Sequence, residues 1–348
     1  MRITGRMLQQ EFSLMRSIFF AKKPIPQPEK IQAIGADVFV LDIEDSVPMA
    51  KKNDHRLMLK EAIPQMGNHC QLVVRINPIR ESSNGGSDCW FKDIEVLAHP
   101  LLRGFILTKV EDAEELKEVD WLLTKMESKL GVEKGHFRLL PNIETARSAS
   151  KAFEIANGCN RNAALVMGTY DLMDDSFAHY PWSRSIMWAA DNIVVAARSA
   201  NIGAIYGPDC AIDSHSVFEK DCRIAYESGF SGRFALTPTQ VTLTNKNFRP
   251  TFKKLKNVHN FLASKEKGIC TFRPSERESR LMSGPPTIKW CERLLGVEKV
   301  RQEHDDKRKP APQPVAPTAR FPASLATTQD YPVGTKITSP FEVTPLIY

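Results

Sequence analysis

The chain has 348 residues, of which 42% are hydrophobic and 25% are charged, and its formal net charge is +6. This composition is typical of a globular protein with a sizeable core and excludes a disordered or fibrous chain. The basic residues are spread along the sequence, apart from Asp305–Lys309 near the C-terminus. Because a nucleic-acid-binding protein normally has a clustered basic face, this spread disfavours that class.

The cysteines and the apolar segments predict the cellular compartment. Seven cysteines are scattered along the chain without a CxxC pair, which indicates reduced thiols. No apolar run approaches the roughly 18 residues of a membrane span. Residues 1–12 lack the apolar segment of a secretory signal. We therefore predict a cytoplasmic protein that binds neither nucleic acid nor membranes.

Short apolar runs alternate with helical patterns over most of the chain. The eight runs lie at residues 17–21, 38–44, 72–77, 104–110, 137–144, 164–171, 203–207 and 233–238. They are apolar on both faces, as strands of a parallel sheet are when helices cover the sheet. Amphipathic stretches, such as 112–130 and 183–202, lie between them. Eight βα units predict a (β/α)8 TIM barrel, whose typical length is about 250 residues.

The sequence after the predicted barrel changes character twice. Residues 251–268 and 287–300 have helical patterns, and a segment rich in Pro, Gly, Arg and Ser joins them. From Gln302 onward, Pro, Thr, Ala and charged residues dominate. We therefore predict a TIM-barrel catalytic domain at 1–248, a C-terminal helical extension at 249–301, and an extended or disordered tail at 302–348.

Charged and amide side chains gather at the carboxyl ends of the second to sixth predicted strands. They are Glu44, Asp45, Arg75, Asn77, Lys109, Glu111, Glu144 and Asp171. In a TIM barrel these strand ends open into one mouth, which holds the active site. Several carboxylates in one site repel each other, and a bound cation relieves the repulsion. Oxygen donors without His or Cys favour Mg²⁺ or Mn²⁺ over zinc.

Each of these residues taken alone also has a structural explanation. Asp45 suits a helix N-cap, and Arg75 suits a structural salt bridge, because an arginine in so apolar a strand needs a partner. Lys109 and Glu111 fit supporting or surface positions better than catalytic ones. Glu144 and Asp171, which end the fifth and sixth predicted strands, are harder to explain by a structural role. The coincidence across four strands favours a functional site.

Several blocks at these positions resemble a known family. They include "MRSIFF", "VLDIEDSVPMAKKNDHR", "VVRINP", "LLPNIETARS" and "VMGTYDLMDD", and they follow one another in order from about Met15 to Leu295. They are similar to blocks of the citrate lyase β-subunit branch of the HpcH/HpaI aldolase/citrate lyase family. The resemblance implies a Mg²⁺-dependent TIM-barrel enzyme that breaks or forms a carbon–carbon bond in a 3-hydroxyacyl thioester, such as a malyl-, citramalyl- or citryl-thioester.

The resemblance also implies roles for residues at the mouth. Glu144 of "NIETA" and Asp171 of "GTYDL" occupy the positions of the family's metal ligands. Glu44 and Asp45 of "DIEDSV" stand where the family orders metal-bound water. Arg75 of "VRINP" matches the arginine that faces the carbonyl and carboxylate oxygens of the substrate.

Further expectations from the resemblance concern substrate binding and assembly. Arg16, Lys52 and Arg56 match basic positions that lie near the acyl carrier or its phosphates. Family members form trimers or hexamers, in which the segment after the eighth strand covers the mouth of a neighbouring barrel. We therefore expect a homotrimer or homohexamer in which residues 271–286 contact another subunit. A monomer with this segment folded over its own mouth is the alternative.

The sequence departs from the family pattern at several functional positions. The first strand leads into Ala21 and two lysines instead of a "VPG" loop. Tyr206 and Thr237 stand where the family commonly has an acid and a histidine. A C-terminal aspartate that serves as acid or base in the acyl-CoA enzymes is replaced by Ser283 or Gly284. Neither replacement can act as a carboxylate base.

Three hypotheses for the function follow. The first is a Mg²⁺-dependent carbon–carbon lyase or aldolase that acts on a hydroxy acid or a hydroxyacyl thioester and gives a 2-oxo acid. The second is an acyl-CoA thioester lyase or hydrolase whose base comes from elsewhere, for example Glu276 or Glu278. The third is a non-catalytic homologue that binds a metal and a carboxylate. The sequence predicts a small carboxylate substrate without naming it.

Overall fold

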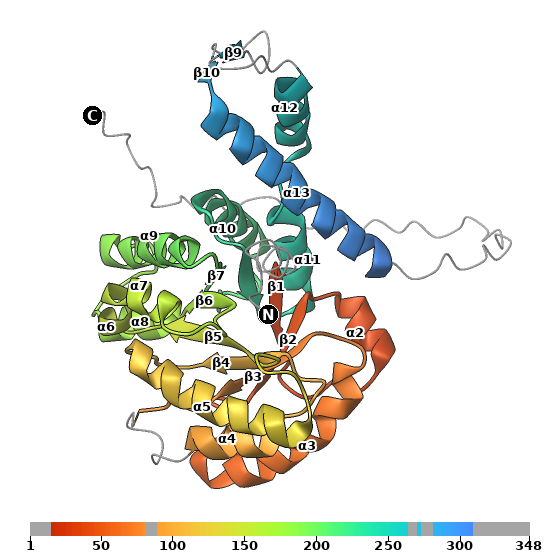
Figure 1. Cartoon of the computed structure of the whole chain (residues 1–348), viewed down its shortest axis with the longest axis vertical. Helices are drawn as coiled ribbons and strands as arrows, with labels where there is room; N and C mark the ends of the chain where they lie inside the picture. Colours follow the sequence, from red (N-terminus) through yellow and green to blue (C-terminus); the bar gives the residue numbers. More distant parts are fainter. Residues whose placement is uncertain (1–14, 81–88, 264–269, 273–280, 309–348) are drawn as a thin grey trace, which may run out of the picture. The chain divides into compact units, whose positions relative to one another are not determined.

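A closed barrel of eight parallel strands forms the body of the protein (Figure 1). The computed structural model describes residues 15–80, 89–263, 270–272 and 281–308. The strands are β1 Ser17–Phe20, β2 Val38–Asp42, β3 Leu72–Ile76, β4 Gly104–Leu107, β5 Arg138–Ile143, β6 Ala164–Met167, β7 Gly203–Tyr206 and β8 Gly232–Ala235. Ile18 of β1 pairs with Val38 on one side and with Phe234 on the other, which closes the sheet. The predicted TIM barrel is confirmed.

Helices surround the barrel and bury their apolar faces against it. They are α2 Pro28–Ile34, α3 Lys52–Gly67, α4 Cys89–Leu97, α5 Ala113–Leu130, α6 Ala146–Ser150, α7 Ala152–Asn157, α8 Thr169–Asp175, α9 Arg184–Ser199, α10 His215–Ser228 and α11 Pro238–Asn247, with a 3-10 turn at Met49–Lys51. Strands β4 to β7 are buried along their whole length, as expected between two apolar layers. Within the described part of the chain, no helix is both long enough and apolar enough to cross a membrane.

Local sequence explains where the longest of these barrel helices begins and ends. The Asp112 carboxylate accepts a hydrogen bond from the first turn of α5, and Glu115 reaches back to the N-cap backbone, which completes a capping box. Gly131 ends the helix with a φ of 68°, a left-handed conformation that glycine adopts without steric cost.

The C-terminal region consists of two helices and a small two-stranded sheet. These are α12 Phe252–Ala263, α13 Pro285–Arg308, and the antiparallel pair β9 Cys270–Phe272 and β10 Leu281–Ser283. Val258, Phe261 and Cys291 form a small core of their own between the helices. The predicted helical extension is therefore present, while residues 273–280, with Glu276 and Glu278, and residues 309–348 lie outside the described residues.

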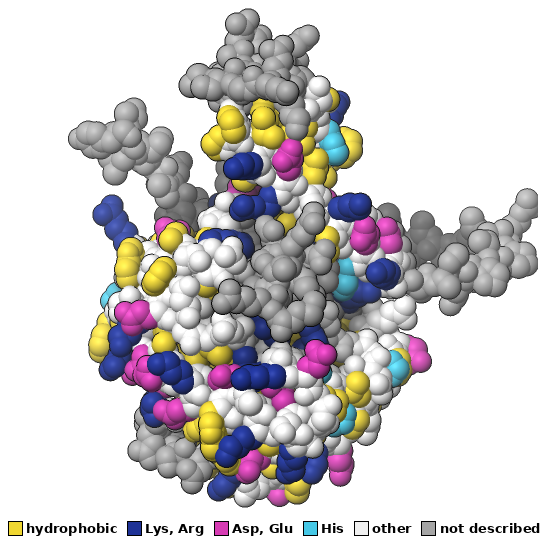
Figure 2. Space-filling model, viewed as in Figure 1, with side chains coloured by type: hydrophobic (Ala, Val, Ile, Leu, Met, Phe, Trp, Pro, Cys, Tyr) yellow, Lys and Arg dark blue, Asp and Glu magenta, His cyan; other side chains and the backbone are white. Residues whose placement is uncertain are grey.

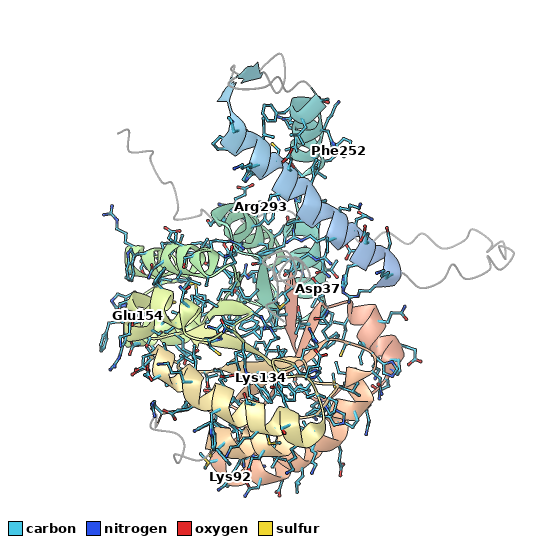
Figure 3. All side chains as sticks on the ribbon, in the orientation of Figure 1. Asp37, Lys92, Lys134, Glu154, Phe252 and Arg293 are labelled. Atoms are coloured by element: carbon cyan, nitrogen blue, oxygen red, sulfur yellow. The ribbon has the colours of Figure 1, made fainter. Side chains whose placement is uncertain are left out.

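Helix α13 continues through residues 302–308, which the sequence analysis placed in the tail. The reason is a set of charges at the amino-terminal end of the barrel. Arg16 Nε donates to Asp37 Oδ2 at 2.9 Å, and its Nη1 donates to Asp305 Oδ2 at 3.0 Å. Arg308 Nη1 donates to Asp37 Oδ1 at 2.8 Å. Polar residues typical of a tail thus find partners around Asp37, which Figure 3 labels.

Candidate active site

The carboxyl ends of the strands bring five of the predicted residues to one mouth. Glu44 and Asp45 follow β2, Arg75 lies in β3, Glu144 follows β5, and Asp171 lies in the first turn of α8 after β6. Their charges converge on the Lys109 side chain, which follows β4: Glu44, Asp45, Asp171 and Glu144 together raise its pKa against the lowering effect of its burial. The barrel therefore assembles four carboxylates around one lysine.

Arg75 is held in a fixed plane at this mouth. Its Nε and Nη2 donate to the two oxygens of Asp42, each at 2.7 Å, and its Nη1 lies 3.1 Å from Glu44 Oε2. The guanidinium lies 5.1 Å from the centre of the Phe20 ring. Burial would raise the pKa of Asp42, but the hydrogen bonds and charge of Arg75 outweigh it and lower that pKa. The two hydrogen bonds to Asp42 use the Nε–H and one Nη2–H, and the other N–H groups of Arg75 remain outside this pair.

The Glu144 carboxylate is buried, with only 2% of the residue exposed. Its Oε1 accepts a hydrogen bond from the Lys109 backbone N–H, and its Oε2 accepts one from the Asn142 side-chain amide. Burial, followed by the negative charge of Asp171, raises the pKa of Glu144 to about 8. The carboxylate therefore lies in a fixed position without full charge compensation.

Two backbone features make room for Glu144 and orient its partners. Gly168, at the end of β6, lies so close that an added Cβ would collide with the Glu144 Cβ and Oε2. Lys109 has a φ of 50°, an uncommon conformation for a residue other than glycine. This conformation belongs to the residue whose amide contacts Glu144, so the strain is located at the site itself.

Glu44 is the second buried carboxylate of the mouth. Its Oε2 accepts a hydrogen bond from the Asp45 backbone N–H at 3.0 Å, and its Oε1 lies 3.4 Å from Lys109 Nζ. Burial and the charge of Asp45 raise the pKa of Glu44 to about 7, although Arg75 and Lys109 oppose the shift. The pKa of Asp171 is also raised, first by burial and then by Asp45. Negative charge thus exceeds positive charge in this region.

Lys52 and Arg56 lie beneath the mouth and are buried. Lys52 Nζ donates to the backbone carbonyls of Ile43 and Glu44, each at 2.9 Å, and to the Asn77 side chain. Arg56 Nε donates to Asp93 Oδ1 at 2.6 Å. The Lys52 contacts hold the chain that follows β2 and thereby fix Glu44, whereas the Arg56 contact joins α3 to α4. Both predicted substrate-binding residues are occupied by protein groups.

Arg16 was also predicted to bind the substrate, but the fold does not bring it to the mouth. It precedes β1, so it lies at the amino-terminal end of the barrel, where Asp37 and Asp305 accept its hydrogen bonds. Its guanidinium is separated from the carboxyl-end cluster by the length of the barrel strands. The structure thus groups Glu44, Asp45, Arg75, Glu144 and Asp171 and leaves Arg16 apart.

Three residues of the mouth have larger roles than the sequence analysis assigned to them. Asp42 fixes the plane of Arg75, Asn142 contacts Glu144, and Lys109 bridges Glu144 and Glu44 through its backbone and its side chain. Asn142 precedes Glu144 by two residues, a spacing that places both side chains on the same side of an extended chain. That spacing in the sequence could have identified Asn142 as a residue of the site.

A divalent cation fits the donors at Glu144 and Asp171. The buried Asn142 Oδ1 and Thr169 Oγ1 atoms have no hydrogen-bond partner, although both residues lie at the carboxyl ends of neighbouring strands. All of these donors are oxygens, which Mg²⁺ and Mn²⁺ prefer. A cation would also compensate the charge that raises the pKa of Glu144.

A tighter acidic cluster lies at the opposite end of the barrel. Among the described residues, Asp37, His304 and Asp305 form the group of three whose possible ligand atoms lie within 4.8 Å of one another. Arginines already neutralise these carboxylates, because Arg16 contacts both and Arg308 contacts Asp37. The cluster therefore needs no cation, and charge balance favours the mouth even though its ligand atoms are more widely spaced.

Comparison with known proteins identifies the class to which this barrel and mouth belong. The family model described as HpcH/HpaI aldolase/citrate lyase matches residues 17–238, so the chain belongs to that family. The citrate lyase subunit beta of Leuconostoc mesenteroides subsp. cremoris is 30% identical over 258 residues, which cover 73% of this chain and 83% of the relative. The resemblance seen in the sequence is confirmed.

Two further relatives indicate the range of the family. The L-malyl-CoA/beta-methylmalyl-CoA lyase of Cereibacter sphaeroides is 29% identical over 263 residues, covering 68% of this chain and 80% of the relative. The structure of CitE from Mycobacterium tuberculosis, solved with magnesium, acetoacetate and coenzyme A, is 25% identical with a TM-score of 0.64. The similarity covers 82% of this chain and 98% of that chain. Named relatives are thus carbon–carbon lyases, and a solved relative binds magnesium.

Proposed function

We propose that this protein is a Mg²⁺-dependent carbon–carbon lyase or aldolase that acts on a hydroxy acid or a hydroxyacyl thioester and yields a 2-oxo acid. The observation that carries the proposal is the set of carboxylates around Lys109, next to an arginine whose plane is fixed. Such a concentration of acids is unfavourable unless a cation binds to it. The relatives that cleave citrate or malyl-CoA support this reaction class.

Each residue of the mouth has a role in this proposal. Glu144 and Asp171 would hold Mg²⁺, with Mn²⁺ as a substitute. Held there, the ion would supply Lewis-acid chemistry to the oxygens of the 2-oxo acid portion. Arg75 uses N–H groups that do not donate to Asp42 to orient a substrate carboxylate or carbonyl and to stabilise the negative charge that develops there. Glu44 and Asp45 orient water or hydroxyl groups at the same point.

A pocket beside the mouth supports a thioester as the substrate. It has a volume of ≈ 850 Å³ and is lined by apolar residues that include Phe19, Ile25 and Leu236. Lys22 and Lys23 also line it, and both are exposed. An apolar pocket with lysines among its lining residues suits a thiol carrier with phosphate groups. The M. tuberculosis relative bound coenzyme A.

A metal-dependent product screen tests the proposal. Pyruvate, glyoxylate and oxaloacetate release should be measured from a panel of hydroxyacyl-CoA thioesters and free hydroxy acids, with and without Mg²⁺. We expect Mg²⁺-dependent release that is lost in Glu144→Gln. The matched control is Glu154→Gln, because Glu154 is an exposed glutamate on α7 (Figure 3). No release from any member of the panel would refute the proposed activity.

The proposed enzyme forms a homotrimer or homohexamer through its C-terminal region. Figure 2 shows hydrophobic side chains gathered over α12 and α13. Phe252 on α12 is 83% exposed, which is unusual for a large apolar side chain. Light scattering should give a trimeric or hexameric mass, and Phe252→Ser should reduce it. A monomeric mass for the unmodified chain would contradict this assembly.

A further inference from the structure

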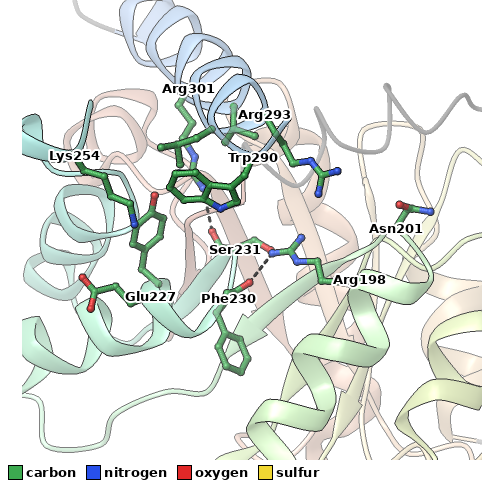
Figure 4. Close-up of a pocket in the computed structure, with 13 residues that line it drawn as sticks. Arg198, Asn201, Glu227, Phe230, Ser231, Lys254, Trp290, Arg293 and Arg301 are labelled. Carbon is green, nitrogen blue, oxygen red and sulfur yellow. Dashed lines mark hydrogen bonds between the residues drawn. The ribbon is translucent and has the colours of Figure 1, made fainter. Parts of the chain in front are cut away.

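A second pocket lies far from the mouth, between the C-terminal helix and the barrel. It has a volume of ≈ 580 Å³ and is lined by α13, by the end of α9, and by the turn between α10 and β8 (Figure 4). Gly229 and Ser231 of that turn precede β8, so the pocket is at the amino-terminal end of the strand. It shares no lining residue with the proposed active site.

Positive charge dominates the walls of this pocket. Arg198 comes from α9, Lys254 from α12, and Arg293 and Arg301 from α13. Figure 4 shows Lys254 on one side of Trp290 and both Arg198 and Arg293 on the other. Glu227 is the acidic residue among the described lining residues. 

The Glu227 carboxylate pairs with Arg223, which is not one of these four cations. Glu227 Oε1 lies 3.4 Å from Arg223 Nε. The pocket therefore has four cationic side chains, and its one described carboxylate pairs with Arg223.

Two of these cations, Arg198 and Arg293, face one another in the pocket. Neither Arg198 nor Arg293 forms a salt bridge with any described residue. Arg198 Nη2 instead donates to the Gly229 carbonyl at 2.6 Å, a neutral acceptor. Both arginines are exposed residues, and the pKa of Arg198 is lowered first by partial desolvation and then by the positive charge of Arg293. Solvent screens the repulsion between these exposed guanidiniums, and an anion between them would accept charged hydrogen bonds from both.

We propose that this pocket binds a small phosphorylated molecule whose phosphate groups lie between Arg198 and Arg293. Planar guanidiniums bind phosphate oxygens in a bidentate manner, which favours phosphate over a single carboxylate. The volume exceeds that of a lone phosphate and accommodates an organic portion against Trp290, Leu294 and Val297. The ligand connects α9 of the barrel to α13, so its binding stabilises the packing of the C-terminal helix.

Calorimetry with inorganic diphosphate tests the site. The full chain should be titrated in EDTA, so that no divalent ion recruits the probe to the mouth. We expect saturable binding with one site per chain. Arg198→Gln and Arg293→Gln should each weaken binding by about tenfold or more, the effect of losing a charged hydrogen-bonding group. Arg184→Gln is the matched control, because Arg184 is exposed at the opposite end of α9.

Thermal melting without diphosphate shows whether each variant is folded, so that a loss of binding can be separated from a loss of structure. Because Arg198 and Arg293 repel each other, their replacement by glutamine should leave the melting temperature unchanged or raise it. Lys254→Gln, at an exposed position, provides a third variant that should weaken binding in the same direction. Arg198→Lys should retain part of the affinity lost in Arg198→Gln.

Three results would overturn the proposal. The first is the absence of saturable diphosphate binding to the unmodified chain. The second is an equal loss of affinity in Arg184→Gln and Arg198→Gln, which would indicate a general charge effect. The third is binding that survives in the pocket variants and disappears in Lys22→Gln/Lys23→Gln, which would locate the anion beside the mouth.

Discussion

Buried carboxylates at the two ends of the barrel differ in how far their negative charge is compensated. At the amino-terminal end, Asp37 is completely buried, and Arg16 and Arg308 both donate to it. At the mouth, Glu44 and Glu144 are nearly as well buried, yet their pKa values rise to about 7 and about 8. The same kind of side chain is thus paired at one end and under-compensated at the other.

This difference separates the residues that stabilise the fold from the residues that bind a ligand. A buried carboxylate with two arginines contributes to the folded state and needs nothing further. A buried carboxylate with a raised pKa costs free energy in the folded state, so its presence points to a ligand that compensates it. The comparison predicts that substitutions at the amino-terminal end reduce stability, whereas substitutions at the mouth reduce metal binding and catalysis.

The largest effect is expected from Asp37→Ala. Removing one partner of a buried ion pair leaves Arg16 without its main acceptor, which costs about 3–5 kcal/mol of unfolding free energy. Chemical denaturation measures this loss. Asp191→Ala is the control, because Asp191 is exposed on α9 and should change stability by less than about 0.5 kcal/mol. A wild-type stability for Asp37→Ala would show that the network is not structural.

The next largest effect is expected from Asp171→Ala at the mouth. Loss of a direct ligand should reduce Mg²⁺ affinity by more than about 100-fold, since even indirect partners of a metal cost 10–100-fold. Isothermal titration calorimetry measures the affinity. Asp174→Ala, at an exposed position in the same helix, should retain Mg²⁺ binding. Unchanged affinity in Asp171→Ala and Glu144→Ala together would eliminate the proposed metal site.

Arg75→Lys should have a smaller effect that is confined to the substrate. Lysine keeps the charge beside Asp42 but loses the planar donor set, so turnover should fall by about tenfold, the loss of one charged hydrogen bond. The melting temperature should move little. Arg80→Lys, just beyond β3, is the exposed control. If Arg75→Lys instead unfolds the protein and leaves activity per folded molecule intact, the arginine is structural.

The smallest effect is expected from two C-terminal truncations that sharpen the comparison at the amino-terminal end. A chain ending at Arg308 retains Asp305 and Arg308 and should melt like the full chain. A chain ending at Arg301 loses both residues, while Arg16 and Asp37 still pair with each other. Because Asp305 and Arg308 are partly exposed, the loss should be about 1 kcal/mol. Equal melting temperatures for both chains would remove residues 302–308 from the stabilising network.

The barrel was predictable because each strand is apolar on both faces and each is followed by a helical pattern. The positions of Glu144 and Asp171 followed from the same logic, since a strand end fixes where its next side chains lie. Lys52 and Arg56 were not predictable in this way. Their partners Asn77 and Asp93 come from other elements, so only the tertiary structure shows that both cations are buried.

The predicted start of the tail at residue 302 differs from the structure for a related reason. Residues 302–308 are polar and charged, a composition that predicts a solvated segment. Their helix forms against a buried carboxylate at Asp37, which lies far away in the chain. Arg16 likewise matches a functional position by sequence block, but its place at the start of β1 puts it at the other end of the barrel.

Lys109 places a limit on what side-chain mutagenesis can reveal about this mouth. Its ammonium group lies near Glu44, whereas its backbone N–H donates to Glu144. Lys109→Ala removes the first contact and keeps the second, so an alanine variant reports only part of the residue's role. Replacing the amide with an ester by chemical ligation would remove the second contact alone. The backbone N–H is in this sense a component of the site that every substitution except proline leaves in place.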